Sequence, residues 1–138
     1  MLFRSHDCRV HTCQCHRTDH GQLFQTQIFA ALGGHGVVSA CGFADIEGAF
    51  DPVVNATSAS LNAELPPLAP SVFAPGALAF DMMYAKAPTV FLQFAAAHGA
   101  RVRDGLGMLV EQAAEAFEVW RGVRPATAEV LQRLRDQL

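Results

Sequence analysis

The sequence predicts an α/β fold with a parallel sheet, flanking helices and a C-terminal pair of helices. Short apolar runs rich in β-branched residues alternate with segments of helical period, and this alternation is typical of parallel sheets. The 138 residues amount to about one domain, which is long enough to bury a core without disulfides. An apolar fraction of 51% with 17% charged residues excludes a disordered or fibrous chain.

Four segments are expected to be strands because they are short, apolar and contain β-branched or aromatic residues. They are residues 37–43, 51–57, 78–84 and 101–103. Pro52 fits poorly in the second strand, since it cannot donate a ladder hydrogen bond. A proline-rich loop is expected to occupy residues 66–76 before the third strand.

Four further segments are expected to be helices because their apolar residues recur at helical spacing. They are residues 23–32, 90–98, 105–121 and a last helix that starts at Pro125. Thr89 is the expected N-cap of the second helix, and Gly122 is expected to end the third. The apolar stripe of the third helix consists of Leu106, Leu109, Val110, Ala113, Phe117 and Trp120.

The charge balance excludes two classes of partner. Ten Lys and Arg against thirteen Asp and Glu give a net charge of −3, which offers no electrostatic surface for nucleic acid or an anionic membrane. The first nine residues carry two Arg and one Asp, so they hold no apolar targeting signal. Four prolines within residues 66–80 exclude a membrane-spanning helix there. We therefore expect a cytoplasmic protein whose cysteines stay reduced.

Residues 1–21 differ from the remainder. They hold three of the four cysteines and four of the six histidines and show no helical or strand period, so we expect a disordered leader before a folded part at 22–138. Cysteine and histidine could ligate zinc, but this spacing fits none of the compact zinc patterns. A leader of unselected composition, from an altered reading frame upstream, explains it better, and no metal site is expected. The cluster consists of Cys8, His11, Cys13, Cys15, His16 and His20.

Three motifs follow one another along the chain. Residues 53–58 read Val-Val-Asn-Ala-Thr-Ser, residues 80–84 read Phe-Asp-Met-Met-Tyr, and residues 104–114 begin Asp-Gly-Leu-Gly-Met-Leu-Val. In this order and spacing they resemble the C-terminal half of shikimate dehydrogenase, and residues 116–125 resemble the end of the same family. The resemblance runs from about residue 29 to residue 138.

The resemblance implies an incomplete Rossmann-like sheet that binds NADP. It also implies an oxidoreductase that reduces 3-dehydroshikimate to shikimate in aromatic amino-acid (chorismate) biosynthesis. Such enzymes have an N-terminal substrate domain with a Lys/Asp pair for proton transfer, and the full-length family includes homodimers. The 138 residues show neither that pair nor a glycine-rich turn after a first strand. We therefore expect a fragment that is inactive alone and holds no catalytic residue.

Met82 and Tyr84 are the candidates at the end of the third strand. They stand at i and i+2, so they are expected to share one face near the carboxyl end of the strand, where open α/β sheets bind ligands. The resemblance assigns Met82 to the nicotinamide and Tyr84 to the substrate. Ordinary sheet packing is the alternative.

Gly105, Met108 and Gln112 are the candidates on the long helix. They fall at i, i+3 and i+7, so they share one helical face, and a glycine at the helix start allows a ligand close approach. The resemblance assigns Gly105 and Met108 to NADP and Gln112 to the substrate. A plain amphipathic helix is the alternative.

Two polar groups complete the expected cofactor site. Asn55, Thr57 and Ser58 end the second strand, where they either line the cofactor groove or serve as turn residues. Arg17 and Thr18 stand where the family has an Asn-Arg-Thr segment that holds the 2′-phosphate, and a guanidinium suits a phosphate. An exposed arginine in an unstructured leader is the alternative there. The alternative function for the whole chain is that of a metal-binding module or an inert remnant without catalysis.

Overall fold

The computed structural model describes residues 2–4, 9–13, 37–57 and 59–138. Their strands form one six-stranded sheet in the order β3-β2-β1-β4-β5-β6. The strands are β1 (Leu2–Arg4), β2 (Arg9–Cys13), β3 (Val37–Cys41), β4 (Phe50–Asn55), β5 (Phe73–Asp81) and β6 (Arg101–Arg103). Three short 3₁₀ turns connect them, η1 (Phe43–Asp45), η2 (Ala59–Asn62) and η3 (Pro70–Val72). The α/β class is confirmed.

The sheet is mixed rather than wholly parallel. β2 and β3 pair in parallel, as do β4 with β5 and β5 with β6, but β1 runs antiparallel to both β2 and β4. The link between β1 and β2 spans only residues 5–8, and so short a connection can join only antiparallel neighbours. β1 and β2 also lie within residues 1–21, for which we expected disorder. Backbone pairing with neighbouring strands does not require a period in the side chains, so the sequence pattern missed them.

β5 begins earlier than expected, within the proline-rich segment. The pairing of β4 with β5 shifts register between Phe50 and Pro52, because Phe50 pairs with Phe73 whereas Pro52 pairs with Leu78. Gly76, at φ +73°, lies in the unpaired stretch of β5 opposite this shift. An irregularity at this point accommodates a proline that cannot donate to a ladder.

Three helices accompany the sheet among the described residues: α2 (Val90–Ala97), α3 (Leu106–Arg121) and α4 (Ala128–Gln137). The Thr89 hydroxyl accepts a hydrogen bond from the Leu92 N–H, which confirms the predicted N-cap of α2. Gly122 ends α3 in the left-handed conformation at φ +71°, also as expected. Pro125 precedes α4 by three residues instead of opening it. The helix predicted at 23–32 and the boundary at residue 21 lie outside the described residues.

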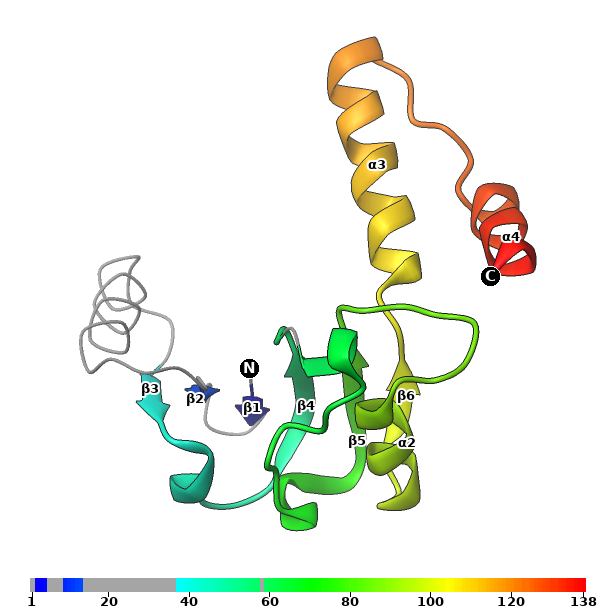
Figure 1. Cartoon of the computed structure of the whole chain (residues 1–138). Coiled ribbons are helices and arrows are strands. Elements are labelled where there is room, and N and C mark those ends of the chain that lie inside the picture. Colours follow the sequence, from blue (N-terminus) through cyan, green and yellow to red (C-terminus); the bar gives the residue numbers. More distant parts are fainter. Residues whose placement is uncertain (1, 5–8, 14–36, 58) are drawn as a thin grey trace.

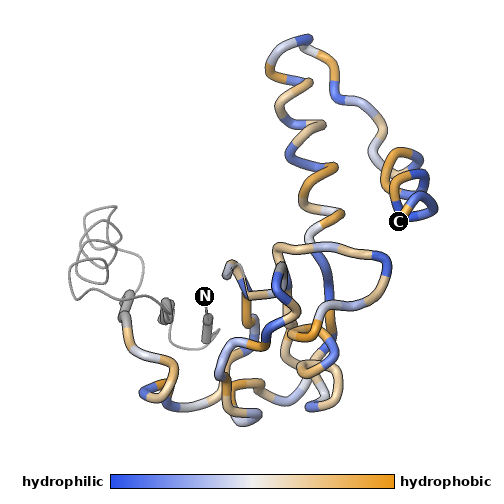
Figure 2. Tube along the Cα trace, in the orientation of Figure 1, coloured by the Kyte–Doolittle hydropathy of each residue, from blue (hydrophilic) through white to orange (hydrophobic). Residues whose placement is uncertain are grey.

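α2 covers β5 and β6 on one face of the sheet, and the core lies between them (Figure 1). Phe50, Val53, Ala79 and Phe91 have almost no exposed surface there. α3 leaves the sheet and projects away from it, with α4 running back beside it (Figure 1). Figure 2 shows hydrophobic positions recurring along α3.

Only two of the six residues in the apolar stripe predicted for α3 are buried. Leu106 and Val110, near the sheet, are buried, whereas Phe117 is 44% exposed and Trp120 is 78% exposed. Between α3 and α4 lies an apolar groove of about 380 Å³ whose walls include Phe117. Helical period defines a stripe, but burial depends on what stands opposite it.

Candidate functional site

The ends of β4 and β5 meet the start of α3. The Met82 N–H donates to the Asn55 carbonyl over 3.0 Å, so the chain leaving β5 stays paired with β4 for one residue beyond the strand. The Gly105 N–H donates to the Met83 carbonyl over 3.1 Å. These two backbone bonds join segments that are far apart in sequence.

Gly105 is buried and precedes α3 directly. Its φ of −78° and ψ of −5° suit any residue, so its conformation does not require glycine. The requirement is steric, because a Cβ would lie 2.0 Å from the Met82 carbonyl oxygen and 2.6 Å from its carbon. The structure therefore brings Gly105 and Met82 together, and the absent Cβ makes room for the chain's own backbone.

Met82 and Tyr84 do not share a strand face, contrary to the expectation. β5 ends at Asp81, Met82 keeps one backbone bond to Asn55 of β4, and residues 83–84 follow without ladder pairing. The Asp81 carboxylate accepts the Met83 N–H over 3.0 Å, which turns this N–H away from a ladder partner. Met82 is 41% exposed and Tyr84 is 38% exposed, so both side chains are accessible in the segment whose backbone contacts Gly105.

The other candidates on α3 follow Gly105 along the first two turns. Met108 is half-buried and Gln112 is exposed. The Leu106 N–H reaches an Asp104 carboxylate oxygen over 3.4 Å, and the Leu109 N–H donates to the Gly105 carbonyl over 3.0 Å. The Gly107 and Met108 N–H groups lie in the first turn, where a helix offers no internal acceptor.

Thr57 has the hydrogen bonds of a turn residue. Its hydroxyl donates to the Asn55 side-chain oxygen over 2.8 Å and accepts from the Ala59 N–H over 3.3 Å, while its N–H also donates to Asn55. These bonds make Thr57 part of the turn that follows β4. Ser58, Arg17 and Thr18 lie outside the described residues.

Asp81 and Ser60 were not singled out from the sequence. Asp81 has no exposed surface, and its carboxylate accepts hydrogen bonds from four donors. A signal was present, because a carboxylate inside the apolar run 78–84 has to be satisfied once that run is buried.

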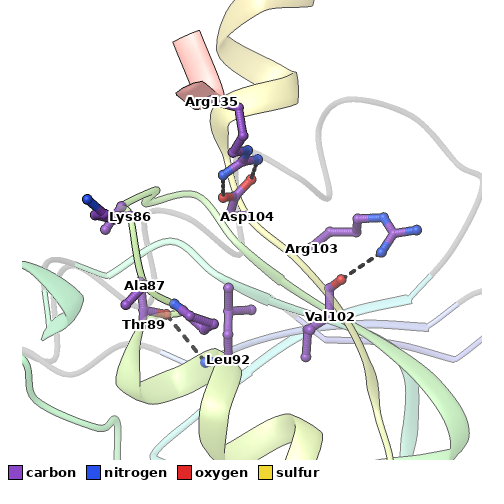
Figure 3. Close-up of a pocket in the computed structure, with 10 residues that line it drawn as sticks. Lys86, Ala87, Thr89, Leu92, Val102, Arg103, Asp104 and Arg135 are labelled. Carbon is purple, nitrogen blue, oxygen red and sulfur yellow. Dashed lines mark hydrogen bonds and ion pairs between the residues drawn. The ribbon is translucent and has the colours of Figure 1, made fainter. Parts of the chain in front are cut away.

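A pocket of about 260 Å³ lies beside this network, between the loop before α2 and the last turn of α4. Figure 3 shows Arg135 of α4 reaching the Asp104 carboxylate, with Lys86 and Arg103 on either side. Arg135 donates to both Asp104 oxygens, over 2.8 Å at Oδ1. The hydrogen bond from Arg135 lowers the pKa of Asp104, and burial opposes this only in part. The ion pair ties α4 to the residue just before α3.

The described ranges lack two features. They hold no group of three or more His, Cys, Asp or Glu side chains placed to bind a metal ion. No helix among them is long and apolar enough to cross a membrane. The Cys/His cluster of the first 20 residues lies largely outside those ranges, and none of its side chains is described.

The family model and the curated relatives that this chain matches are described as shikimate dehydrogenases. The family model for the shikimate 5′-dehydrogenase C-terminal domain matches residues 105–135. A shikimate dehydrogenase (NADP(+)) of Janthinobacterium sp. (strain Marseille) is 66% identical over 96 residues, which are 70% of this chain and 35% of that protein. The chain thus spans about a third of the length of the curated relatives that it matches.

Two solved structures superpose on most of this chain. An Ael1 enzyme from Pseudomonas putida superposes with a TM-score of 0.79 at 44% identity, over 92% of this chain and 45% of that one. A shikimate 5-dehydrogenase from Thermus thermophilus, crystallised with NADP(H) and shikimate, superposes with a TM-score of 0.74 at 28% identity. That match covers 94% of this chain and 46% of the other.

Proposed function

We propose that this chain, which is similar to curated shikimate dehydrogenases over 70% of its own length and matches their C-terminal domain model at residues 105–135, forms the NADP side of such an enzyme. The reaction is the NADP-dependent interconversion of 3-dehydroshikimate and shikimate. One observation carries the proposal: the backbone of Met82 packs directly on Gly105, so a strand end and a helix start meet. The exposed side chains of Met82 and Tyr84 lie beside this junction.

The described residues fit the nicotinamide end of NADP. Met82 offers a flexible, polarisable apolar surface of the kind that a flat ring needs. The first-turn N–H groups of Gly107 and Met108 are donors without acceptors inside the helix, and the helix start favours polar or anionic atoms. We assign Met82, Gly105 and Met108 to this end of the cofactor.

The remaining assignments follow the family resemblance. Thr57 and Ser58 line the cofactor side, and Arg17 with Thr18 holds the 2′-phosphate. Tyr84 and Gln112 hydrogen-bond the substrate, since both carry polar groups on accessible side chains. Bound NADPH supplies the hydride. The residues of this chain hold and orient the cofactor and one side of the substrate, and a homodimer in the cytoplasm is the setting that we propose for the full-length protein.

The proposal is tested by titrating the 138-residue chain with NADPH in a calorimeter. Saturable binding is expected, and Met82→Gln should weaken it on the order of tenfold, about 1.4 kcal/mol. Val119→Gln is the matched control, because Val119 is an exposed apolar residue in the last turn of α3, far along the helix from Gly105. Failure of the wild-type chain to bind NADPH, or an equal loss in both variants, contradicts the proposal.

The 2′-phosphate contact has its own test. Arg17→Gln should reduce the affinity for NADPH while leaving the affinity for NADH unchanged, because the two cofactors differ only in that phosphate. If Arg17→Gln weakens both cofactors equally, Arg17 does not hold the 2′-phosphate.

A further inference from the structure

The Asp81 carboxylate is the most buried polar group of the described residues. It lies at the end of β5 with no exposed surface. A carboxylate in such a place is costly unless its oxygens are hydrogen-bonded. The structure satisfies both oxygens with hydrogen bonds from four donors.

The donors divide between the two oxygens. Oδ2 accepts from the hydroxyls of Ser60 in η2 and Thr89 at the start of α2, over 2.8 and 2.6 Å. Oδ1 accepts from the Asn55 amide over 3.3 Å and from the Met83 backbone N–H over 3.0 Å. Oδ2 therefore bonds to η2 and the start of α2, whereas Oδ1 bonds to the end of β4 and to the segment that leaves β5.

The bond to Met83 leads directly to the candidate site. The Met83 N–H is held by Asp81, and the Met83 carbonyl is held by the Gly105 N–H over 3.1 Å. Met83 is thus fixed at both ends, between β5 and the start of α3. Its neighbours Met82 and Tyr84 carry the exposed side chains, so their positions depend on this residue.

We propose that Asp81 is a positioning residue: acting through the Met83 amide, it holds Met82 and Tyr84 against the start of α3 in the arrangement that the nicotinamide and the substrate require. Asp81 touches neither ligand, because it is buried. This inference rests on the proposed function for its consequence, while the positioning itself can be measured in the chain without ligand.

Two substitutions of Asp81 distinguish a positioning role from a purely structural role. Asp81→Val removes both acceptors and keeps a residue that suits a strand. Asp81→Asn should act as a rescue variant, since the Ser60 and Thr89 hydroxyls can turn to accept from the new amide, whereas the Met83 N–H can only donate. The amide oxygen is therefore expected to stay on Met83. Ser60→Ala is the matched control, because it removes a donor from Oδ2 and an acceptor from the Asn55 amide but leaves the Met83 N–H bonded to Oδ1.

The first measurement is amide hydrogen exchange by NMR on the ligand-free 138-residue chain, with the Ala79 amide in β5 as the internal reference. In the wild type, the Met83 amide should be protected although its neighbours are exposed. In Asp81→Val, the Met83 and Gly105 amides should exchange at least about tenfold faster relative to Ala79. They should keep their wild-type ratio in Asp81→Asn and Ser60→Ala.

Rapid exchange of Met83 in the wild-type chain overturns the proposal, and this measurement does not depend on any variant that fails to fold. An equal rise for Met83, Gly105 and Ala79 in Asp81→Val also overturns it, because it reports only a loss of global stability.

The second measurement compares the affinities for NADPH and for adenosine 2′,5′-bisphosphate, which has no nicotinamide. Asp81→Val should weaken NADPH about tenfold and the bisphosphate less than about twofold, and Asp81→Asn should restore NADPH. Equal weakening of both ligands shows a structural role and refutes positioning. If the wild-type chain binds neither ligand, the proposed function fails, and hydrogen exchange alone decides whether Asp81 positions the segment.

Discussion

Gly105→Ala is expected to destabilise this chain more than a single methyl group usually does. The new Cβ would lie 2.0 Å from the Met82 carbonyl oxygen and 3.2 Å from the Met82 Cα. Packed carbon and oxygen atoms sit about 3.5 Å apart, so the junction has to open by about 1.5 Å. The neighbour is backbone, which cannot rotate aside as a flexible side chain would.

The cost can be worked from two contributions. Overpacking of this kind costs about 1–3 kcal/mol. Opening by about 1.5 Å also breaks the 3.1 Å bond from the Gly105 N–H to Met83, at about 0.5–1.5 kcal/mol. The free energy of unfolding should fall by about 1.5–4.5 kcal/mol, a large share of the roughly 5–15 kcal/mol of an ordinary domain.

Urea denaturation of the 138-residue chain measures this loss. With a slope of about 2 kcal/mol per molar urea, the midpoint should fall by about 1–2 M. Gly107→Ala is the matched control, because a Cβ there meets nothing within 4 Å and an alanine inside a helix gains about 0.5–1 kcal/mol. The two substitutions should therefore act with opposite signs. A Gly105→Ala chain as stable as the wild type would refute the steric argument.

Three further outcomes are expected. Arg135→Gln should cost at most about 1 kcal/mol at neutral pH, because Arg135 is 43% exposed. Since the folded pKa of Asp104 is lowered, this contribution is present above the ordinary carboxyl value of 3.8 and lost below it. The difference in unfolding free energy between wild type and Arg135→Gln should therefore shrink as the pH falls below 3.8, and a constant difference would contradict the linkage. The 138-residue chain should show no NADP-linked oxidation of shikimate, and turnover within a hundredfold of about 10 per second would contradict this. Metal analysis should find no stoichiometric zinc, whereas one tightly bound zinc that is lost in the Cys13→Ser, Cys15→Ser double variant would revive the metal-binding alternative.

The order of the elements from residue 37 onward was predictable, because it depends on local patterns. β3, β6 and the α2 N-cap at Thr89 appear where the sequence places them, and α3 ends at Gly122. Capping, helical period and β-branched runs act over a few residues, so each can be recognised without knowledge of distant neighbours.

The candidate site was predictable only in part. Met82 and Gly105 could be matched to a family pattern, but the reason for the glycine could not be read from the sequence. It is the carbonyl of a residue 23 positions earlier in the chain that excludes a Cβ. The prediction that Met82 and Tyr84 share a strand face was wrong, because Asp81 captures the Met83 N–H and ends β5 first.

The sequence by itself determined the class of fold, the family pattern and the local caps of this protein. Only the tertiary structure decided which residues of the apolar stripe on α3 are buried, since Leu106 is buried and Trp120 is exposed on the same helix. It also decided that β1 and β2 join the sheet and that four donors from separate segments converge on Asp81. Local propensities act between near neighbours, whereas strand pairing, steric exclusion and the satisfaction of a buried carboxylate depend on residues brought together only by folding.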